Sequence, residues 1–460
     1  MYKVNFKEHQ SHIHFIGIGG ISMSGLARIL LMQGFTISGS DLSETPLCEE
    51  LKALGATIFY GQVASNIIPG IDCVVYTAAI SQDNEEYLEA KRQGLHMLGR
   101  SALLGQIMDN YKMPIAVAGT HGKTTTTSMV STLLLAGGLD PTISVGGILP
   151  AIGGNLRIGQ SDIFVTEDCE YTNSFLDFRP KVSIILNIEE DHMDFFKGIE
   201  EIYDSFHRFA RELPPDGHLI INGDIPDYEK VTYDLPCQVT TYGFQTDLDY
   251  SAQAIAYDEK GLASFDFYKK GVFQTRIQLS VTGEHNVSNA LSVIALGEIL
   301  ALDLSQIQTG LVNFDGTKRR FEYKGSYQGV HVIDDYAHHP TEIKATLQAA
   351  KHYQSQALWL VFQPHTFTRT KAFFKDFVEA LSPVDHLILT DIYAAREKNT
   401  LGISSEDLYK EILKTGCDAY YIADFENVRD FLQKNCASGD LLITMGAGDV
   451  VNIGENLLNS

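Results

Sequence analysis

A turn bounded by glycines and followed by lysine and threonine stands near residue 120. It reads Gly119-Thr120-His121-Gly122-Lys123-Thr124-Thr125, between a β-branched run and a helical pattern. Backbone N–H groups at such a turn and at the following helix N-terminus would face an anion. Lys123 would neutralise terminal phosphates, and the Thr124 hydroxyl would ligate Mg²⁺. Because Val117 replaces the first glycine of the pattern G-x-x-x-x-G-K-[ST], a tight turn with an ordinary surface lysine is the alternative.

Carboxylates and an imidazole follow two strand-like runs in the middle of the chain. Glu167 ends one run, and the segment 187–192, NIEEDH, follows the other. Ligands of open α/β sheets bind at the carboxyl ends of parallel strands, so these groups should lie beside the phosphate turn. Mg²⁺ prefers oxygen, which would make a His192 ligand unusual. The alternative is that Glu190 and Asp191 are solvated and that His192 only packs.

A second glycine turn lies near the N-terminus and reads Gly17-Ile18-Gly19-Gly20-Ile21-Ser22. It is similar to a dinucleotide-binding fingerprint in which Ser22 replaces the third glycine. Ser40 and Asp41 end the next strand-like run, about where a ribose-binding acid belongs. The pattern predicts that a diphosphate meets the helix N-terminus, without indicating which diphosphate.

Three polar clusters occur in the last third of the chain. Lys318-Arg319-Arg320 is a basic run in an acidic chain, for which a solvated linker face is the alternative. The segment 334–340, DDYAHHP, lies between a strand-like run and a helical pattern, and the segment 362–369, FQPHTFTR, adds a fixed cation at Arg369. Acids, aromatic rings and imidazoles at such junctions favour a binding role, although a helix N-cap is also open for one of them.

Length and composition limit what these motifs can belong to. The chain has 460 residues, which suggests about three domains. Its 35 Lys and Arg against 58 Asp and Glu give a net charge of −23, which argues against general binding to nucleic acid or to an anionic membrane. Six scattered cysteines without a C-x-x-C pair fit a reducing compartment. We expect a cytoplasmic protein without membrane insertion, as a monomer or a homodimer.

Short β-branched runs alternate with helical patterns, which is typical of α/β domains with mainly parallel sheets. We predict a Rossmann-like domain at 1–110, a central domain at 111–316 and a Rossmann-like α/β domain at 317–460. Strands are expected at 12–16, 36–40, 73–76, 115–118, 163–167, 182–187, 218–222, 330–333, 357–362, 386–390 and 441–445. Helices are expected at 22–33, 124–136, 287–300, 341–352 and 371–381, and antiparallel β structure at 249–280.

Taken in order, the motifs resemble the Mur ligase family of cell-wall precursor enzymes. The resemblance covers nearly the whole chain through HFIGIGGISMSGLA, AGTHGKTTT, EDCEYTNSFLDF, NIEEDHMD, GEHNVSNA, FDGTKRRFE, DDYAHHPTEI, FQPHTFTRTKAF and MGAGDV. It implies a first domain for the UDP part of a sugar nucleotide, a central P-loop-type ATPase domain and a third domain for the amino acid. The motifs are most similar to members that use ATP and an acyl phosphate to join L-alanine to UDP-N-acetylmuramate in peptidoglycan precursor synthesis.

The resemblance also implies roles for individual residues. Lys123, His192, Arg320 and Asp335 would be catalytic, with Arg320 reaching the γ-phosphate. ATP would contact residues 119–125, Arg320 and Asn286, with Asn289 nearby. Mg²⁺ would be surrounded by Thr124, Glu167 and His192. The UDP-sugar would lie against Gly17, Gly19, Gly20, Ile21, Ser22, Ser40 and Asp41, and the amino acid against Tyr336, His338 and Arg369.

Three other functions remain open. A ligase of the same chemistry could join a ready-made peptide to UDP-N-acetylmuramate during wall recycling, with the first two domains shared. A nicotinamide-dependent oxidoreductase would rest on the turn 17–22 and Asp41, but it would leave Lys123, Glu167 and Arg320 unexplained. A nucleotide-gated binding protein would bind the same ligands without ligation.

Overall fold

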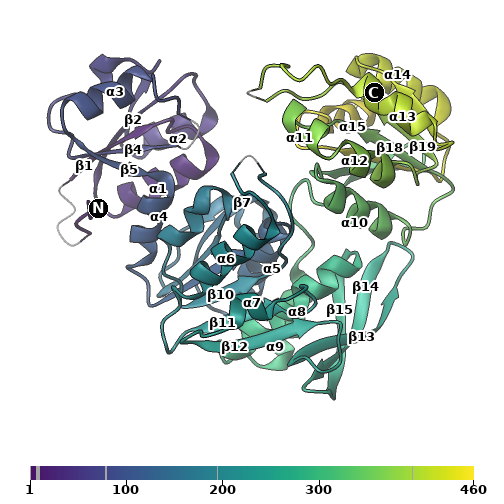
Figure 1. The fold of residues 1–460 in the computed structure, drawn as a ribbon, viewed down its shortest axis with the longest axis horizontal. Helices are drawn as coiled ribbons and strands as arrows, with labels where there is room; N and C mark the ends of the chain where they lie inside the picture. The colour runs from purple at the N-terminus through teal and green to yellow at the C-terminus, as the bar shows by residue number, and fades with distance from the viewer. Residues whose placement is uncertain (1, 7–10, 78–79, 194, 396) are drawn as a thin grey trace. The chain divides into compact units, whose positions relative to one another are not determined.

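The computed structural model describes residues 2–6, 11–77, 80–193, 195–395 and 397–460. The chain forms two compact units, whose helices and strands are labelled in Figure 1. Unit 1 comprises residues 1–250 and 292–310, and unit 2 comprises residues 251–291 and 311–460. Within the described ranges, no helix combines the length and the apolar character needed to cross a bilayer.

The first segment of unit 1 is a five-stranded parallel sheet in the order β3-β2-β1-β4-β5. Its elements are β1 (His12–Ile16), α1 (Ile21–Met32), β2 (Thr36–Asp41), α2 (Pro46–Ala53), β3 (Thr57–Tyr60), η1 (Ala64–Asn66), β4 (Cys73–Tyr76), α3 (Glu85–Arg92), β5 (His96–Gly99) and α4 (Arg100–Met108). Helices α1, α2 and α4 pack on one face and α3 on the other. The strand order reverses between β1 and β4, and ligands of open α/β sheets bind at such a switch point.

The middle segment is built on a ten-stranded sheet in the order β15-β14-β13-β12-β11-β10-β6-β9-β7-β8. Unit 1 holds β6 (Met113–Ala118), α5 (Lys123–Ala136), β7 (Thr142–Leu149), η2 (Pro150–Ile152), β8 (Gly154–Arg157), β9 (Ile163–Glu167), η3 (Tyr171–Asp177), β10 (Val182–Ile185), α6 (Ile199–Ala210), β11 (His218–Asn222), α7 (Glu229–Thr232) and β12 (Gln238–Gly243). Further along come β13 (Tyr250–Tyr257), β14 (Leu262–Lys269), β15 (Val272–Thr282), α8 (Glu284–Ile299) and α9 (Leu304–Asn313). Strands β6, β9, β10, β11 and β12 pair in parallel, whereas β14 and β15 pair antiparallel.

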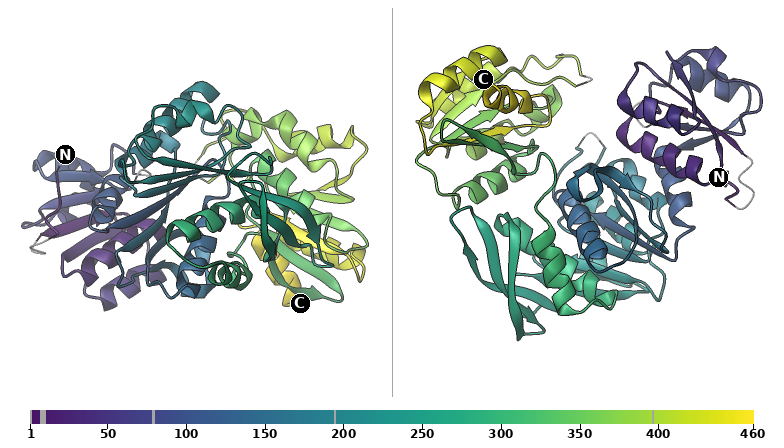
Figure 2. Two further views of the ribbon diagram at one scale, coloured as in Figure 1. Left: turned by 90° about the horizontal axis from the view of Figure 1, so that it is seen from below. Right: turned by 180° about the vertical axis from the view of Figure 1, so that it is seen from behind.

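The last segment, in unit 2, is a six-stranded sheet in the order β16-β17-β21-β18-β19-β20, parallel except for β16 with β17. Its elements are β16 (Glu322–Tyr327), β17 (Val330–Asp335), α10 (Pro340–Ala350), β18 (Leu358–Phe362), α11 (Phe367–Ala372), α12 (Phe374–Leu381), β19 (His386–Leu389), α13 (Ser405–Leu413), β20 (Asp418–Tyr421), α14 (Phe425–Asn435), β21 (Leu441–Met445) and α15 (Val451–Leu458). Helices α10, α12 and α13 pack on one face, and α14 and α15 on the other (Figures 1 and 2).

The observed architecture confirms the predicted α/β class with mainly parallel sheets. The predicted strands 12–16, 73–76, 163–167, 218–222 and 441–445 have the observed bounds. The prediction of one continuous helix at 371–381 is wrong. These residues are divided between α11 and α12 because Phe373 adopts φ −105° and ψ 26°. The strand predicted at 182–187 ends at Ile185.

Candidate functional site

The loop between β6 and α5 carries the predicted phosphate turn. Helix α5 begins directly after Gly122, whose φ of +82° is a left-handed conformation that favours glycine. No side chain caps this helix, so the N–H groups of its first turn remain available to an anion. The side chain of Asn187, just beyond β10, accepts from the N–H of His121 at 2.7 Å and donates to the carbonyl of the same residue at 3.0 Å. The turn is therefore held in shape by its neighbouring strand.

The other residues of the turn are tied to the same neighbouring segment or enter the helix. Thr120 follows Gly119, and its hydroxyl accepts the N–H of Glu189 at 3.0 Å. The ring of His121 lies 3.7 Å from the Glu189 carboxylate. Thr125 is half-buried in the first turn of α5. These contacts follow from the parallel pairing of β6 with β10, which brings their carboxyl ends together.

The ammonium group of Lys123 points back into the turn. It donates to the carbonyls of Gly119 and Thr120, the latter at 3.0 Å, and to the Glu170 carboxylate at 3.2 Å. Burial opposes the charged form, but Glu170 and other nearby groups outweigh that effect and raise the pKa of Lys123. Lys123 is thus a cation held at a helix N-terminus and not an ordinary surface lysine.

Thr124 and Glu167 form a pair of hard oxygen ligands next to Lys123. The Thr124 hydroxyl donates to the Glu167 carboxylate at 2.7 Å. Within the described part of the chain, no group of three or more His, Cys, Asp and Glu side chains is arranged to hold a metal. Mg²⁺ commonly takes one or two protein oxygens and completes its shell with phosphate and water. The pair therefore fits a magnesium ion that arrives with a phosphate ligand.

Gly146 in β7 gives the Glu167 carboxylate its room. A Cβ at this position would lie 1.7 Å from Glu167 Oε1. We expect Gly146→Ala to move that carboxylate away from Thr124 and to lower kcat about 100-fold, since misplacing a reacting group by about 1 Å costs that much. Thermal unfolding should change little because the displaced atoms end a flexible side chain. Gly154→Ala is the matched control, since a Cβ there meets nothing within 4 Å; equal kcat in the two variants would contradict the prediction.

Two acidic residues that sequence reasoning missed lie between the predicted ones. Glu170, 3% exposed, contacts Lys123 and lies 3.9 Å from His192 Nε2. Burial raises the pKa of Asp168 well above its usual value, and neither of its carboxylate oxygens has a hydrogen-bond partner among the residues described. His192 adopts φ +54°, and its ring lies 4.5 Å from that of Tyr171. The sequence signal that could have indicated Glu170 and Asp168 is the run of acidic residues in TEDCEY, residues 166–171. Asp194, the last residue of the motif NIEEDHMD, lies outside the described residues.

The glycine turn of the first segment closes onto β2. The N–H groups of Gly17 and Ile18 both donate to the Ser40 carbonyl at 2.9 Å. The N–H of Gly19 donates to the Asp41 carboxylate at 2.8 Å. The turn and the end of β2 are therefore brought together, and one oxygen of Asp41 already serves to hold the turn.

Helix α1 starts at Ile21 after Gly20, again without a side-chain cap. The hydroxyl of Ser22 accepts from the Arg100 guanidinium at 3.0 Å. Serine in place of the usual glycine thus fixes a cation from the start of α4 beside the turn. Sequence reasoning missed this arginine.

The two adjacent arginines of unit 2 have different surroundings. Arg319 donates to the buried Asp334 carboxylate at 2.9 Å and to the carbonyls of Gly448 and Gly446 at 3.0 and 2.7 Å. The guanidinium groups of Arg319 and Arg320 both lie over the Tyr336 ring, at 5.0 and 5.1 Å, and Arg320 also makes a long ion pair with Glu342 at 4.0 Å. Arg319 is therefore fixed by hydrogen bonds to Asp334 and to the 446–448 loop, whereas Arg320 is held by a ring contact and a long ion pair, and the basic run is not a solvated linker face.

Asp335 ends β17 and fixes the loop that carries the arginines. Its two oxygens accept the N–H groups of Phe321 at 2.8 Å and Ala337 at 2.7 Å. Burial raises the pKa of Asp335 to about 6. The catalytic role predicted for this residue stays a prediction.

The residues predicted to meet the amino acid lie together at the carboxyl ends of β17 and β18. The rings of Tyr336 and His338 are 5.5 Å apart, and those of His338 and His365 are 5.7 Å apart. Arg369, on α11, has its guanidinium 3.3 Å from His365 Nδ1. The sequence left open which residue of the segment 334–340 caps the following helix. In the structure this residue is His339, which caps α10 together with Glu342.

Acid should weaken unit 2 through His338. Burial lowers the pKa of His338 from its ordinary 6.5 to about 4, despite the nearby Glu342 carboxylate. Because the unfolded chain binds a proton at His338 near pH 6.5 and the folded protein does so only near pH 4, the unfolding free energy is unaffected by His338 above pH 6.5. It falls as the pH drops from 6.5 toward 4, by an amount on the order of 3 kcal/mol. We expect the unfolding free energy, measured with denaturant from pH 7 to pH 4, to fall less in His338→Gln. If the unfolding free energy depends on pH equally in wild type and in His338→Gln, this role of His338 is refuted.

Asn286 lies in the first turn of α8, in unit 2. Its amide donates to the Thr282 carbonyl at 2.8 Å, and its side-chain oxygen accepts from Asn289 at 3.1 Å. The side chains of the two asparagines are thus in contact. Their proximity to an adenine stays a prediction.

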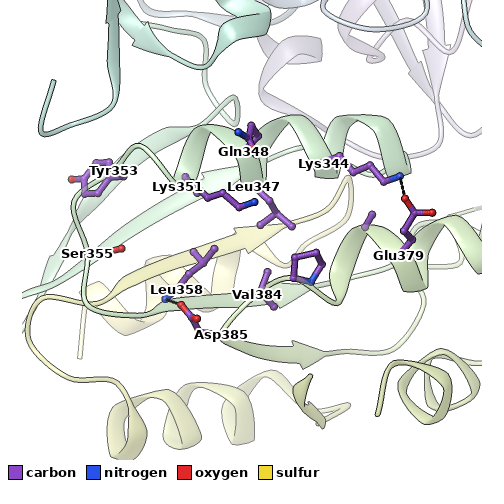
Figure 3. Close-up of a pocket in the computed structure, with 13 residues that line it drawn as sticks. Lys344, Leu347, Gln348, Lys351, Tyr353, Ser355, Leu358, Glu379, Val384 and Asp385 are labelled. Carbon is purple, nitrogen blue, oxygen red and sulfur yellow. Dashed lines mark hydrogen bonds and ion pairs between the residues drawn. The ribbon is translucent and has the colours of Figure 1, made fainter. Parts of the chain in front are cut away.

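The pocket in Figure 3 lies between α10, α12 and the start of β18. Its lining includes Leu358, the first residue of β18, and the ion pair of Lys344 with Glu379 at 2.7 Å. The pocket therefore opens at the amino end of β18, whereas Asp335 ends β17 at the carboxyl edge. None of the predicted site residues is among the residues that line it.

Family descriptions match three consecutive stretches of the chain. Residues 12–112 match the catalytic domain of the Mur ligase family, residues 117–297 the Mur ligase middle domain, and residues 319–448 the glutamate ligase domain of Mur ligases.

Whole proteins match over the full length as well. The chain is 58% identical to a UDP-N-acetylmuramate–L-alanine ligase of Agathobacter rectalis and 54% identical to one of Lachnoclostridium phytofermentans, each covering 100% of both chains. A crystal structure of the UDP-N-acetylmuramate–alanine ligase of Thermotoga maritima matches with a TM-score of 0.81 and 28% identity, over 97% of this chain and 98% of that one. A murein peptide ligase of Psychrobacter arcticus matches with a TM-score of 0.71 and 25% identity, over 98% of each chain. With its three segments, its phosphate turn and relatives of this identity, the chain belongs to the Mur ligase family.

Proposed function

We propose that this chain is an ATP-dependent ligase that joins L-alanine to the carboxylate of UDP-N-acetylmuramate in peptidoglycan precursor synthesis. The observation that carries the proposal is the Lys123 ammonium, held at the uncapped N-terminus of α5 by the turn and by Glu170. The relatives at 58% and 54% identity supply the substrates by their names. The matches to Mur ligase domains give no support to the alternative of a nicotinamide-dependent oxidoreductase.

The chemistry requires that a carboxylate be activated before an amine can attack it. A carboxylate is resonance-stabilised, and oxide is a poor leaving group. Transfer of the γ-phosphoryl group to the carboxylate gives an acyl phosphate; the L-alanine amine then attacks, and the tetrahedral intermediate loses phosphate. In this proposal Lys123 and Arg320 offset the charge that spreads over the transferring phosphoryl oxygens.

Magnesium belongs to the same proposal. Thr124 and Glu167 would hold the ion, with His192 beside it, and the ion would neutralise charge on the phosphate oxygens. Two observations support this magnesium site. The Thr124 hydroxyl and the Glu167 carboxylate, both hard oxygen ligands, are 2.7 Å apart, and Gly146 leaves space for that carboxylate.

The remaining assignments follow the motifs. The UDP-sugar would lie against the turn 17–22, Ser40 and Asp41, and the adenine near Asn286. The amino acid would lie against Tyr336, His338 and Arg369, with Asp335 completing the ATP site.

The proposal also covers the location and assembly of the protein. All six cysteines are free, and Cys48 and Cys73 are buried, as expected in a reducing compartment. We therefore propose a cytoplasmic protein, and a monomer or a homodimer stays a prediction.

The decisive assay is phosphate release with ATP, Mg²⁺ and UDP-N-acetylmuramate across a panel of amine substrates. We expect release to depend on L-alanine and to be weaker with glycine and L-serine. Faster release with a ready-made tripeptide would replace the proposal with the peptide ligase. Amine-independent binding of ATP without release would replace it with a nucleotide-gated binding protein.

A further inference from the structure

Glu170 belongs to the motif EDCEYTNSFLDF, but no step of the proposed chemistry gives it a role of its own. It follows β9 by three residues, and its side chain is 3% exposed. One oxygen, Oε2, accepts from Lys123 Nζ at 3.2 Å. The other, Oε1, lies 3.9 Å from His192 Nε2 and has no hydrogen-bond partner among the described residues. One buried carboxylate thus stands between the cation of the phosphate turn and the imidazole beside it.

The donors of Lys123 are fully used in this arrangement. An ammonium group has three N–H donors. Those of Lys123 go to the carbonyls of Gly119 and Thr120 and to the Glu170 carboxylate. A phosphate oxygen can therefore contact this ammonium only if one of these acceptors gives up its place. The carbonyls belong to the turn itself, whereas Glu170 comes from a different segment, so the carboxylate is the acceptor that can be exchanged without rebuilding the turn.

We propose that Glu170 is a positioning residue that holds the Lys123 ammonium inside the turn and competes with nucleotide phosphates for it. This inference rests on the proposed function only in requiring that the turn binds a nucleotide. It predicts opposite effects of Glu170 on binding and on turnover. Removing the charge removes a competitor and so tightens binding, but it also leaves Lys123 without its lateral anchor and so slows the reaction.

The test measures ADP affinity by calorimetry in the presence of a chelator, so that no divalent cation contributes. We expect Glu170→Gln to bind ADP about tenfold more tightly than wild type, because a hydrogen bond to a charged group is worth at least that factor. In the Lys123→Ala background the same substitution should change ADP affinity less than about twofold, since the competition acts through Lys123. With Mg²⁺ and all substrates, kcat of Glu170→Gln should fall about tenfold while the KM for ATP falls.

Glu190→Gln is the matched control, because Glu190 is an exposed carboxylate of the segment 187–192; its ADP affinity should equal that of wild type. Unchanged or weaker ADP binding in Glu170→Gln overturns the inference. Equal tightening with and without Lys123 also overturns it, since the carboxylate would then act on the phosphates directly. If Glu170→Gln does not fold, Glu170→Ala, which also removes the carboxylate, is judged by the same criteria. If wild-type protein binds no ADP or ATP at all, the proposed function fails instead.

Discussion

Lys123→Ala should reduce ligation at least about 10³-fold, because in the proposed function the charge that develops on the transferring phosphoryl group loses Lys123 as a fixed cation. The loss should fall on kcat, and UDP-N-acetylmuramate binding should persist, since the turn 17–22 belongs to another sheet of unit 1. Glu170 would lose its ion-pair partner inside the protein, so we also expect the thermal midpoint to fall by a few degrees. Phosphate release, calorimetry with the UDP-sugar and thermal unfolding measure the three effects.

Lys112→Ala is the matched control for this substitution. Lys112 immediately precedes β6, the strand that leads into the turn, and pairs with Asp162 at 2.6 Å, but its side chain is 83% exposed. Exposed pairs contribute little, so this variant should ligate like wild type. Near-normal ligation by Lys123→Ala would remove the basis of the ATP assignment.

The parts of the fold that the sequence predicts best are strands buried on both faces. Strands β4 and β21 have continuous apolar or β-branched sequences, as does β9 up to its last residue, Glu167, and the predicted bounds of all three are the observed ones. The missed strands are mostly edge strands such as β3, β8 and β20, which are half-exposed. An edge strand packs on few neighbours, so its sequence need not carry the apolar pattern on which such predictions depend.

The candidate site shows a similar limit. Spacing alone indicated Lys123, Thr124 and Glu167 because their positions relative to strand ends and a helix start are local features. Glu170 could not be found in this way, since its contact with Lys123 depends on how the chain turns after β9, where Thr172 and Asn173 adopt positive φ. When two residues on different loops meet only in the folded protein, as Lys123 and Glu170 do, no fixed spacing in the sequence predicts their contact.

Arg320→Ala should impair formation of the acyl phosphate about 10³-fold, the scale on which an arginine acts in phosphoryl transfer. Sequence alone could not separate Arg319 from Arg320. In the structure, both guanidinium groups lie over the Tyr336 ring, but Arg319 also donates to Asp334, Gly446 and Gly448, whereas Arg320 makes a long ion pair with Glu342 at 4.0 Å and its side chain is 29% exposed. Positional isotope exchange in ATP, measured without L-alanine, reports acyl phosphate formation directly. The KM for UDP-N-acetylmuramate should change less than about twofold.

Arg319→Ala separates the catalytic effect from a structural one. It would leave Asp334, which is fully buried, without its cation, and breaking such a pair costs about 3–5 kcal/mol. We therefore expect Arg319→Ala to lower the thermal midpoint of unfolding strongly, and Arg320→Ala to leave it nearly unchanged. Arg320→Lys should recover little isotope exchange, because an ammonium cannot reproduce the planar donor set of a guanidinium. Normal isotope exchange in Arg320→Ala would show that Arg320 does not act on the γ-phosphate.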